Sequence, residues 1–444
     1  MAIDILSRWE EKRLPIDLIM EQYISDSTLA DSRDRQLIMS LVYGVLRWRG
    51  YLDWVIGKHS RHPLTKMKSR TLQALRVGLF QLCFMDRIPP SAAINETVQA
   101  LKDMHQPKWL SGFVNGVLRS IDRQRQKIPT PSETGRLPEL AALNHPEWLI
   151  RRWQSRFGQE MAATICRANN CIAPLFLRVN TKCTTRDGLL KKLTAAGLDA
   201  ELGAYCPTAI KLIGYNGPVA EIPGFAEGLF QVQDEAAQLV SMLMGPLENK
   251  KSYLDGCAGL GGKTSHLAQM LPAESMLFAT EPHGGRVKKL KENLARLHLE
   301  STVHILEGRV ESLLPEMQEK FTGILLDAPC SGLGVIRRHP DIRWTRVPED
   351  FMRYAKIQLE ILASAAQLLE PGGIIVYATC STEPEENQDV VNKFLADHTG
   401  FSLVDCRDVL PDNCACFVDE DGYFQTIPGQ GDLDGFFAVR MTKK

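Results

Sequence analysis

From about residue 250 onward, short apolar runs alternate with helical patterns, and no other feature of the sequence constrains the fold as strongly. This alternation is typical of a parallel, doubly wound sheet with helices on both faces. We therefore predict an α/β domain of Rossmann-like architecture over residues 246–444. Its helices are expected at 263–271, 285–298, 349–369 and 385–397. Its strands are expected at Tyr253–Leu254, Met276–Ala279, Val303–Leu306, Ile324–Leu326, Ile374–Tyr377, Phe401–Val404 and Gly435–Met441.

The remainder of the chain is predicted to form two further domains. Residues 1–127 carry apolar side chains at helical spacing without strand-like alternation, which indicates an all-α domain. Residues 128–140 are rich in Pro, Ser and Thr, a composition that suits a linker. Residues 141–245 are predicted to form a small α+β connector. Its expected elements are a helix at Pro146–Ala168, a strand at Leu175–Val179, a helix at Thr185–Ala196 and strands near Ile210 and Phe230.

The charges are distributed unevenly, although the formal net charge is only −1. Residues 1–127 contain 20 basic and 13 acidic residues, so this region is basic and the remainder is acidic. Within it, a basic run surrounds the single acid Asp53; its members are Arg47, Arg49, Lys58, Arg61, Lys66, Lys68, Arg70 and Arg76. Such a run is either a solvated helical face or a surface that faces phosphates, because Lys and Arg gain affinity from counterion release. The charges alone do not decide between these interpretations.

The cysteine pattern indicates a reducing compartment, and the hydropathy of the chain indicates neither a signal peptide nor a membrane span. The eleven cysteines include no Cys-x-x-Cys pair, which disfavours a disulfide framework and a zinc site. The first residues lack the apolar core of a signal peptide, and no apolar run reaches the length of a membrane span. We expect a cytoplasmic protein that binds neither a metal nor a membrane.

A glycine-rich loop follows the first predicted strand of the α/β domain and precedes a helix; it reads Asp255-Gly256-Cys257-Ala258-Gly259-Leu260-Gly261-Gly262-Lys263-Thr264. Glycines let the backbone approach a ligand closely, and the helix N-terminus offers free N–H groups. The loop is not the phosphate loop of NTPases, because that motif requires a glycine where Cys257 stands. Acids end the next two strands. Glu281 is placed to accept hydrogen bonds from ribose hydroxyls, and Glu307 to meet the adenine end of a ligand. Loop and acids together favour a nucleoside cofactor.

Two cysteines follow the ends of the fourth and fifth predicted strands, in Asp327-Ala328-Pro329-Cys330-Ser331-Gly332 and in Tyr377-Ala378-Thr379-Cys380-Ser381. Adjacent parallel strands would place Asp327, Cys330 and Cys380 at one edge of the sheet, beside the cofactor loop. A single cysteine is more often a small buried hydrophobe than a nucleophile, but a shared edge with an acid weakens that interpretation.

Two cysteines and an acid beside a cofactor loop suit methyl transfer to C5 of a cytosine. A thiolate that adds to C6 of cytosine lets C5 accept a methyl group from a sulfonium, and an acid such as Asp327 can relieve the ring charge at N3. The cytosine must be flipped or unpaired, since C6 is not reachable in a stacked duplex. The residues alone do not decide which cysteine attacks.

These motifs resemble those of the RNA cytosine-C5 methyltransferases of the NOL1/NOP2/Sun type. Further matches are Arg178-Val179-Asn180-Thr181, Val232-Gln233-Asp234-Glu235-Ala236, Glu385-Glu386-Asn387 and Asp434-Gly435-Phe436-Phe437. The helical N-terminal region resembles the RNA-binding NusB fold. The combination is similar to the bacterial members that methylate small-subunit ribosomal RNA. The resemblance therefore implies a NusB-like all-α domain, a small α+β connector and a class I methyltransferase domain that uses S-adenosylmethionine.

The resemblance also implies the roles of individual residues. Cys380 would attack C6, Cys330 would assist release of product and Asp327 would contact the cytosine edge. The implied S-adenosylmethionine contacts are Cys257, Ala258, Gly259, Leu260, Gly261, Gly262, Lys263, Glu281, Glu307 and Asp327. The chain departs from the family pattern at Gly259-Leu260, where Ala-Pro is usual, and at Glu281 and Glu307, where aspartates are usual. These departures predict a looser loop and shifted cofactor contacts.

Ribosomal RNA of the small subunit, or a subunit that is being assembled, is the expected partner. Arg337, Arg338, Arg343 and Arg346 follow the Pro-Cys loop and are predicted to contact RNA phosphates, whereas Trp344 is expected in the core. Two alternatives stay open: the same chemistry on transfer RNA, and a non-catalytic RNA-binding assembly factor with a degenerate cofactor site. The sequence reveals neither the target cytosine nor the oligomeric state.

Overall fold

The computed structural model describes residues 1–25, 32–313 and 320–444, which form two compact units. The first unit comprises Met1–Ile172 and Ile336–Arg346, and the second comprises Ala173–Val335 and Val347–Lys444. The chain therefore leaves the second unit after Val335, contributes a short segment to the first unit and then returns.

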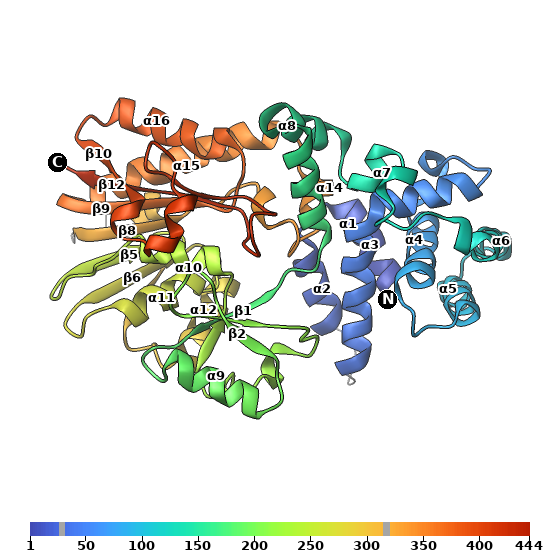
Figure 1. Cartoon of the computed structure of the whole chain (residues 1–444), viewed down its shortest axis with the longest axis horizontal. Coiled ribbons are helices and arrows are strands. Elements are labelled where there is room, and N and C mark those ends of the chain that lie inside the picture. The colour runs from blue at the N-terminus through green and yellow to red at the C-terminus, as the bar shows by residue number, and fades with distance from the viewer. Residues whose placement is uncertain (26–31, 314–319) are drawn as a thin grey trace. The chain divides into compact units, whose positions relative to one another are not determined.

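The first unit is helical, as predicted (Figure 1). Apolar faces of its first six helices meet in one core, to which Leu6, Val42, Leu75, Ile94 and Leu118 contribute fully buried side chains. The helices are α1 (Ala2–Lys12), α2 (Ile16–Ser25), α3 (Ser32–His59), α4 (Ser69–Phe84), α5 (Pro90–Asp103), α6 (Lys108–Gln124), α7 (Glu139–Leu143), α8 (Glu147–Asn170) and α14 (Ile342–Thr345). Proline precedes or begins α5 to α8, a position where its missing N–H costs nothing.

The segment Ile336–Arg346 is packed into the first unit through polar contacts. The Arg343 side chain is fully buried and donates hydrogen bonds to the Asn144 carbonyl at 3.2 Å, the Asn170 side chain at 2.6 Å and the Asn169 carbonyl at 2.7 Å. The Trp344 indole donates to the Leu46 carbonyl at 2.7 Å and packs against the core, as predicted. These contacts fasten the segment to α3 and α8.

The prediction that the arginines of this segment contact RNA phosphates is wrong for two of the four. Arg343 is 0% exposed and Arg337 is 4% exposed, so neither guanidinium presents a surface to a phosphate. Burial lowers the pKa of Arg343 to about 9. The acceptors that hold Arg343 come from a part of the chain distant in sequence, so the local run of cations gave no sign of them.

The basic run of the first unit divides between core and surface. Arg76 is buried and donates two hydrogen bonds of 2.7 Å to the Asp53 carboxylate. Arg49 lies within 3.4 Å of Glu10 and 3.9 Å of Asp53. The members left exposed are Lys58, Arg61, Lys66, Lys68 and Arg70. Part of the run is therefore structural, which neither interpretation predicted, and the remainder forms a solvated basic surface. That this surface faces phosphates stays a prediction.

The second unit begins with a small antiparallel sheet of order β2-β3-β1-β4. Its strands are β1 (Leu175–Val179), β2 (Ala200–Leu202), β3 (Ala209–Leu212) and β4 (Phe230–Val232), with α9 (Arg186–Ala195) packed on it. Thr185 caps α9, because its side chain accepts a hydrogen bond from the Gly188 N–H. The helix α10 (Glu235–Met242) then leads into the large sheet.

The large sheet has the order β10-β12-β9-β8-β5-β6-β7, with β11 paired to β12. The five strands from β9 to β7 are parallel, whereas β12 and β10 run antiparallel at one edge. The strands are β5 (Ser252–Asp255), β6 (Met276–Glu281), β7 (Val303–Glu307), β8 (Phe321–Asp327), β9 (Leu369–Thr379), β10 (Phe401–Val404), β11 (Phe424–Thr426) and β12 (Phe436–Lys443). All seven strands predicted in this region are present, and the predicted parallel sheet carries an antiparallel edge.

Helices cover both faces of this sheet, as Figure 1 shows. One apolar core joins the sheet to α10, α11 (Gly262–Met270) and α12 (Gly284–Arg296), and a second joins it to α15 (Glu349–Leu368) and α16 (Gln388–Asp397). The strand order reverses between β5 and β8. Ligands of open α/β sheets bind at the carboxyl ends of the strands at such a switch point. The glycine-rich loop after β5 and Asp327 at the end of β8 lie there.

We expect Arg343→Met to destabilise the first unit by about 3 kcal/mol, because three buried acceptors lose their donor while most of the side-chain volume is kept. Urea unfolding followed by circular dichroism measures the change. The control is Arg123→Met on the exposed surface of α6, which should leave the midpoint within error of the native value. Equal midpoints for both variants would show that Arg343 does not hold the segment in place.

Candidate active site

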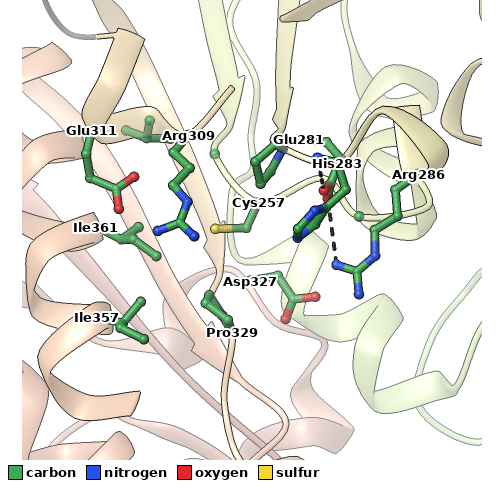
Figure 2. Close-up of a pocket in the computed structure, with 14 residues that line it drawn as sticks. Cys257, Glu281, His283, Arg286, Arg309, Glu311, Asp327, Pro329, Ile357 and Ile361 are labelled. Carbon is green, nitrogen blue, oxygen red and sulfur yellow. Dashed lines mark hydrogen bonds and ion pairs between the residues drawn. The ribbon is translucent and has the colours of Figure 1, made fainter. Parts of the chain in front are cut away.

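A pocket of about 370 Å³ opens at the carboxyl ends of β5, β6 and β8. Figure 2 shows side chains from several elements around it: Glu281 at the end of β6, Asp327 at the end of β8, and Ile357 and Ile361 from α15. The full lining is Gly256, Cys257, Gly259, Glu281, Pro282, His283, Arg286, Arg309, Val310, Glu311, Asp327, Pro329, Ile357 and Ile361. The pocket thus combines acidic, basic and apolar walls.

Buried hydrogen bonds of Asp255 hold the glycine-rich loop in shape. Its carboxylate accepts from the Cys257 N–H at 3.2 Å and from the Thr264 hydroxyl at 2.7 Å, and burial raises its pKa to about 6. Gly259 has φ of 56° and lines the pocket, and Gly261 has φ of 86°. A Cβ at Gly261 would lie 2.4 Å from the Leu290 side chain, so this position requires glycine for both backbone and packing.

Arg178 of β1 supports the helix that follows the loop. Its fully buried guanidinium donates to the Gly262 carbonyl at 2.5 Å, to the Ser265 hydroxyl at 2.7 Å and to the Gln233 side chain. Burial lowers its pKa to about 9. The small sheet therefore contributes to the shape of the glycine-rich loop, which links the Arg-Val-Asn motif physically to that loop.

Lys263 and Asp327 join the loops that follow β5 and β8. The Lys263 ammonium lies 2.7 Å from the Asp327 carboxylate and 4.9 Å from the ring centre of Phe436. The Lys263 side chain is only 8% exposed, whereas that of Asp327 is 34% exposed. Asp327 therefore keeps part of its carboxylate at the pocket while the buried lysine holds one oxygen.

The structure gathers only some of the predicted cofactor residues around the pocket. Cys257, Gly259, Glu281 and Asp327 line it. The other loop members serve the loop itself: Ala258 donates to the Thr280 carbonyl at 3.0 Å and accepts from the Gly261 N–H at 2.9 Å, and the Gly262 carbonyl is held by Arg178. Leu260 is 49% exposed. Glu307 is exposed next to Glu281 in the β6–β7 register and is not part of the pocket lining.

Several lining residues were not predicted from the sequence. Arg309 and Val310 follow β7, and Ile357 and Ile361 lie on one face of α15 because they are four residues apart. The isoleucines carry an ordinary amphipathic signal that does not distinguish a pocket wall from a core contact. Glu281, which was predicted, is 3% exposed, and its Oε1 accepts a hydrogen bond from the His283 N–H at 2.9 Å. Figure 2 shows its side chain beside the pocket.

The two predicted catalytic cysteines are in contact. The Sγ atoms of Cys330 and Cys380 are 3.2 Å apart, and Asp327 pairs with Ala378 in the register of β8 and β9. The hydrogen bond with Cys380 and, after it, burial raise the pKa of the Cys330 thiol well above its usual range. The negative charges of Glu386 and Asp327 act in the same direction. Cys330 is therefore held as a neutral thiol beside Cys380.

Glu386 connects the two loops that carry these cysteines. Its carboxylate accepts from the Ser331 N–H at 2.7 Å and from the hydroxyls of Ser331 and Ser381, each at 2.5 Å. Burial raises its pKa. The side chain is 0% exposed, so these bonds compete with no solvent. Each serine follows its cysteine directly, and a single carboxylate therefore fixes the spacing of the two sulfur atoms.

The backbone of Cys380 is held from a third side. Its carbonyl accepts from the Gly334 N–H at 2.9 Å, and the Gly334 carbonyl accepts from the Gly435 N–H at 2.8 Å. A Cβ at Gly334 would lie 2.1 Å from the Gly435 oxygen, so no larger residue fits there. This packing explains why the Asp-Gly-Phe-Phe motif, far away in sequence, accompanies the cysteine motifs.

Neither a membrane-spanning helix nor a metal-binding cluster is found in the described parts of the chain. No described helix is long and apolar enough to cross a bilayer. Groups of three or more His, Cys, Asp or Glu side chains with metal-binding geometry are likewise absent from residues 1–25, 32–313 and 320–444.

Three family models match successive parts of the chain. Residues 1–123 match the NusB family, residues 145–219 match the ferredoxin-like domain of RsmF/B-like methyltransferases, and residues 241–442 match the model described as 16S rRNA methyltransferase RsmB/F. The NusB-like domain, the connector and the methyltransferase domain are thereby confirmed as fold classes.

Relatives and solved structures agree with these matches. The chain is 35% identical to the probable ribosomal RNA small subunit methyltransferase B of Bacillus subtilis, over 100% of this chain and 98% of the relative. It is 37% identical to the ribosomal RNA small subunit methyltransferase B of Salmonella typhi, over 97% of each chain. The fold is shared with PH0851 (24% identity, TM-score 0.81, 99% of this chain and 97% of that one). It is also shared with a methyltransferase homologue from Pyrococcus horikoshii (25% identity, TM-score 0.59, 71% and 100%). The chain therefore belongs to the RsmB/F family of S-adenosylmethionine-dependent methyltransferases.

Proposed function

We propose that this protein methylates C5 of a cytosine in small-subunit ribosomal RNA, with Cys380 as the covalent nucleophile and Cys330 as its partner thiol. The observation that carries the proposal is the pair of sulfur atoms 3.2 Å apart, at the same sheet edge as Asp327 and the cofactor pocket. Simple methyl transfer to a nucleophilic nitrogen or oxygen would need no thiol at this edge. Two thiols fit a reaction that forms and then breaks a bond to the base.

The pocket suits S-adenosylmethionine in its donor set and its walls. Glu281 is placed to accept hydrogen bonds from ribose hydroxyls, and the isoleucines of α15 with Val310 and Pro329 offer an apolar wall for the adenine. The acids Glu281 and Asp327 complement a cationic ligand. When bound, S-adenosylmethionine would supply the methyl group from its sulfonium to C5, and the sulfur would keep the bonding electron pair and leave as a neutral thioether. Glu307 is kept as a proposed contact on the strength of the family resemblance, although it is exposed outside the lining.

The first half of the reaction uses Cys380 and Asp327. The Cys380 thiolate forms a bond to C6 of the flipped cytosine, and the electron pair of the C5–C6 double bond becomes available at C5. Asp327, whose position Lys263 maintains, contacts the N3 edge. The proton that neutralises the ring after addition passes to N3 from the protonated form of this carboxyl group, and it returns there when C5 takes the methyl group. The hydrogen bond with Cys380 and burial raise the pKa of Cys330, so this thiol keeps its proton beside the reacting sulfur.

The second half restores the aromatic ring and frees the enzyme. Once C5 carries the methyl group and N3 has given up its proton, a base removes the C5 proton, the C5–C6 double bond re-forms and the bond between C6 and the Cys380 sulfur breaks to return the thiolate. Cys330 lies within hydrogen-bond distance of the departing sulfur and is placed to assist this release. The clamp by Glu386 keeps that distance through both halves.

Two alternatives remain for the same chain. The relatives are named for ribosomal RNA, which favours that substrate over transfer RNA. A non-catalytic assembly factor would follow if the changed loop at Gly259-Leu260 no longer bound cofactor. Gly259 has the positive φ that glycine adopts without strain, and this supports a loop adapted to its sequence.

We expect Glu281→Ala to weaken S-adenosylmethionine binding by about 10- to 100-fold, because hydrogen bonds to a buried carboxylate are lost. Isothermal titration calorimetry measures the dissociation constant. Glu292→Ala on the exposed face of α12 is the matched control. The same titration on Glu307→Ala decides whether this exposed acid reaches the ligand. Unchanged affinity in Glu281→Ala would place the cofactor elsewhere, and no heat from the native protein would favour the assembly factor.

We expect Glu386→Gln to lower kcat by about 10- to 100-fold, because an amide donates where the serines need an acceptor and the cysteine loops shift apart. Single-turnover methylation assays measure the effect. Cofactor affinity and the melting temperature should stay near native values, and Glu386→Asp should recover part of the rate. The control is Glu360→Gln on the exposed face of α15. A matching loss in cofactor affinity would mean that Glu386 supports the whole domain.

The covalent step is tested with RNA that contains 5-fluorocytosine in place of cytosine. Fluorine cannot leave C5 as the proton does, so the adduct persists and shifts the protein band on a denaturing gel. We expect the native protein and Cys330→Ala to form the adduct with small-subunit ribosomal RNA and Cys380→Ala to form none.

The opposite pattern, with loss only in Cys330→Ala, would reverse the roles of the two cysteines. An adduct with transfer RNA but not with ribosomal RNA would change the substrate. No adduct with either RNA, from folded protein that binds S-adenosylmethionine, would refute the covalent mechanism.

A further inference from the structure

A second pocket lies in the first unit, far in sequence from the methyltransferase domain. It has a volume of about 420 Å³ and is formed by the segment before α4 and the first turns of α6. Its lining consists of His62, Lys66, Met67, Lys68, Thr71, Gln106, Pro107, Trp109, Leu110 and Phe113. The volume falls in the range of small-ligand sites in proteins.

One wall of this pocket is an exposed tryptophan. Trp109 is 72% exposed, whereas Trp9 and Trp153 are 2% and 0% exposed. Leaving so much indole surface in water costs free energy, because the ring buries a large apolar area when it is covered. His62 and Phe113 also line the pocket, and their rings meet edge to face, with centroids 5.5 Å apart and an interplanar angle of 72°. Flat aromatic surfaces therefore border the pocket.

The charge at the pocket is positive. Lys66 and Lys68 line it, none of the lining residues is acidic, and neither lysine forms an ion pair with any residue that the structure describes. The buried cations of the same basic run behave differently, since Arg76 pairs with Asp53. The unpaired lysines at the pocket thus remain available for an anion.

We propose that this pocket binds an unpaired nucleotide of the substrate RNA, with the base stacked on Trp109 and the neighbouring phosphates held by Lys66 and Lys68. This inference rests on the proposed function in taking RNA as the substrate. Aromatic rings bordered by cations suit a nucleotide, because every base has a face that stacks and every linkage carries a charge. An apolar protein segment would gain nothing from the two lysines, so charge complementarity favours the nucleic acid.

The site gives the first unit a specific task. The pocket belongs to the first unit and the cysteine site to the second, so the RNA would have a contact point in each unit. A single unpaired nucleotide is a feature of loops and bulges, which proteins recognise in RNA more often than they recognise duplex sequence. The pocket would therefore select for RNA structure, whereas the cysteine site acts on the cytosine.

The test uses the full chain and two fluorescein-labelled RNAs, a short single strand and a fully paired hairpin, with binding followed by fluorescence anisotropy. Trp109→Leu keeps an apolar side chain but removes the ring. We expect it to weaken single-strand binding by about 5- to 100-fold, the range for loss of one stacked base, and to leave hairpin binding nearly unchanged. Trp109→Phe, which keeps an aromatic face, should recover part of the affinity.

The lysines are tested through salt dependence. We expect Lys66→Ala/Lys68→Ala to reduce the slope of log affinity against log salt by about 1.4, since each phosphate contact on a single strand contributes roughly 0.7. The matched control is Lys12→Ala/Lys127→Ala, which removes the same charge from exposed positions outside the pocket. Photocrosslinking with 5-iodouridine RNA should place a crosslink in the peptide that contains Trp109.

Native affinity in Trp109→Leu together with an unchanged crosslink pattern would overturn the proposal, and would leave a protein partner as the occupant of this surface. A salt slope that falls equally in the control double variant would also overturn it. The covalent reaction is tested separately. If Trp109→Leu loses RNA binding but the native protein forms no 5-fluorocytosine adduct, the proposed nucleotide pocket is supported and the proposed cytosine chemistry is refuted. If the native protein forms the adduct and Trp109→Leu binds RNA with native affinity, the cytosine chemistry is supported and the nucleotide pocket is refuted.

Discussion

The buried carboxylate of Glu386 is the contact on which the geometry of the cysteine site depends. It accepts hydrogen bonds from two serines that each follow a cysteine, and the sulfur atoms consequently meet at 3.2 Å. The cost of burying this charge is offset by three donors in a region without solvent. The proposed reaction, which makes and breaks a carbon–sulfur bond, would use both thiols beside one ring. The sheet supplies the edge, but this carboxylate sets the distance.

The cofactor side of the site depends on contacts that cross between sheets. Arg178, on the small antiparallel sheet, holds the backbone at Gly262, and Lys263 then pairs with Asp327 at the end of β8. The connector is consequently more than a spacer, because it supports the loop that borders the pocket. Asp327 links the pocket to the cysteine site. It lines the pocket, and it pairs with Ala378 on β9, the strand that leads to Cys380.

Buried arginines recur in this protein as structural groups. Arg343 fastens the segment from the methyltransferase chain to the helical unit, Arg76 neutralises Asp53 and Arg178 supports the loop. Each guanidinium satisfies several acceptors at once, which a single planar fork does better than an ammonium. The lysines of the first unit instead stay at the surface, where Lys66 and Lys68 border the aromatic pocket. Within the basic run, Arg76 thus has a structural role, whereas Lys66 and Lys68 remain at the surface.

The sequence by itself determined the type and order of the elements and the identity of the motifs at strand ends. Periodicity is a local property, so the strands from β5 to β9 and helices such as α11 and α15 could be predicted closely. Motif position then placed Cys330, Cys380 and Asp327 at one edge, because neighbouring parallel strands end together. Only the tertiary structure decided which cations are buried, that Glu307 lies outside the pocket, that Ile357 and Ile361 form its wall and that Trp109 is exposed. Those properties depend on partners far apart in sequence, and neither spacing nor composition encodes which distant group will meet a given side chain.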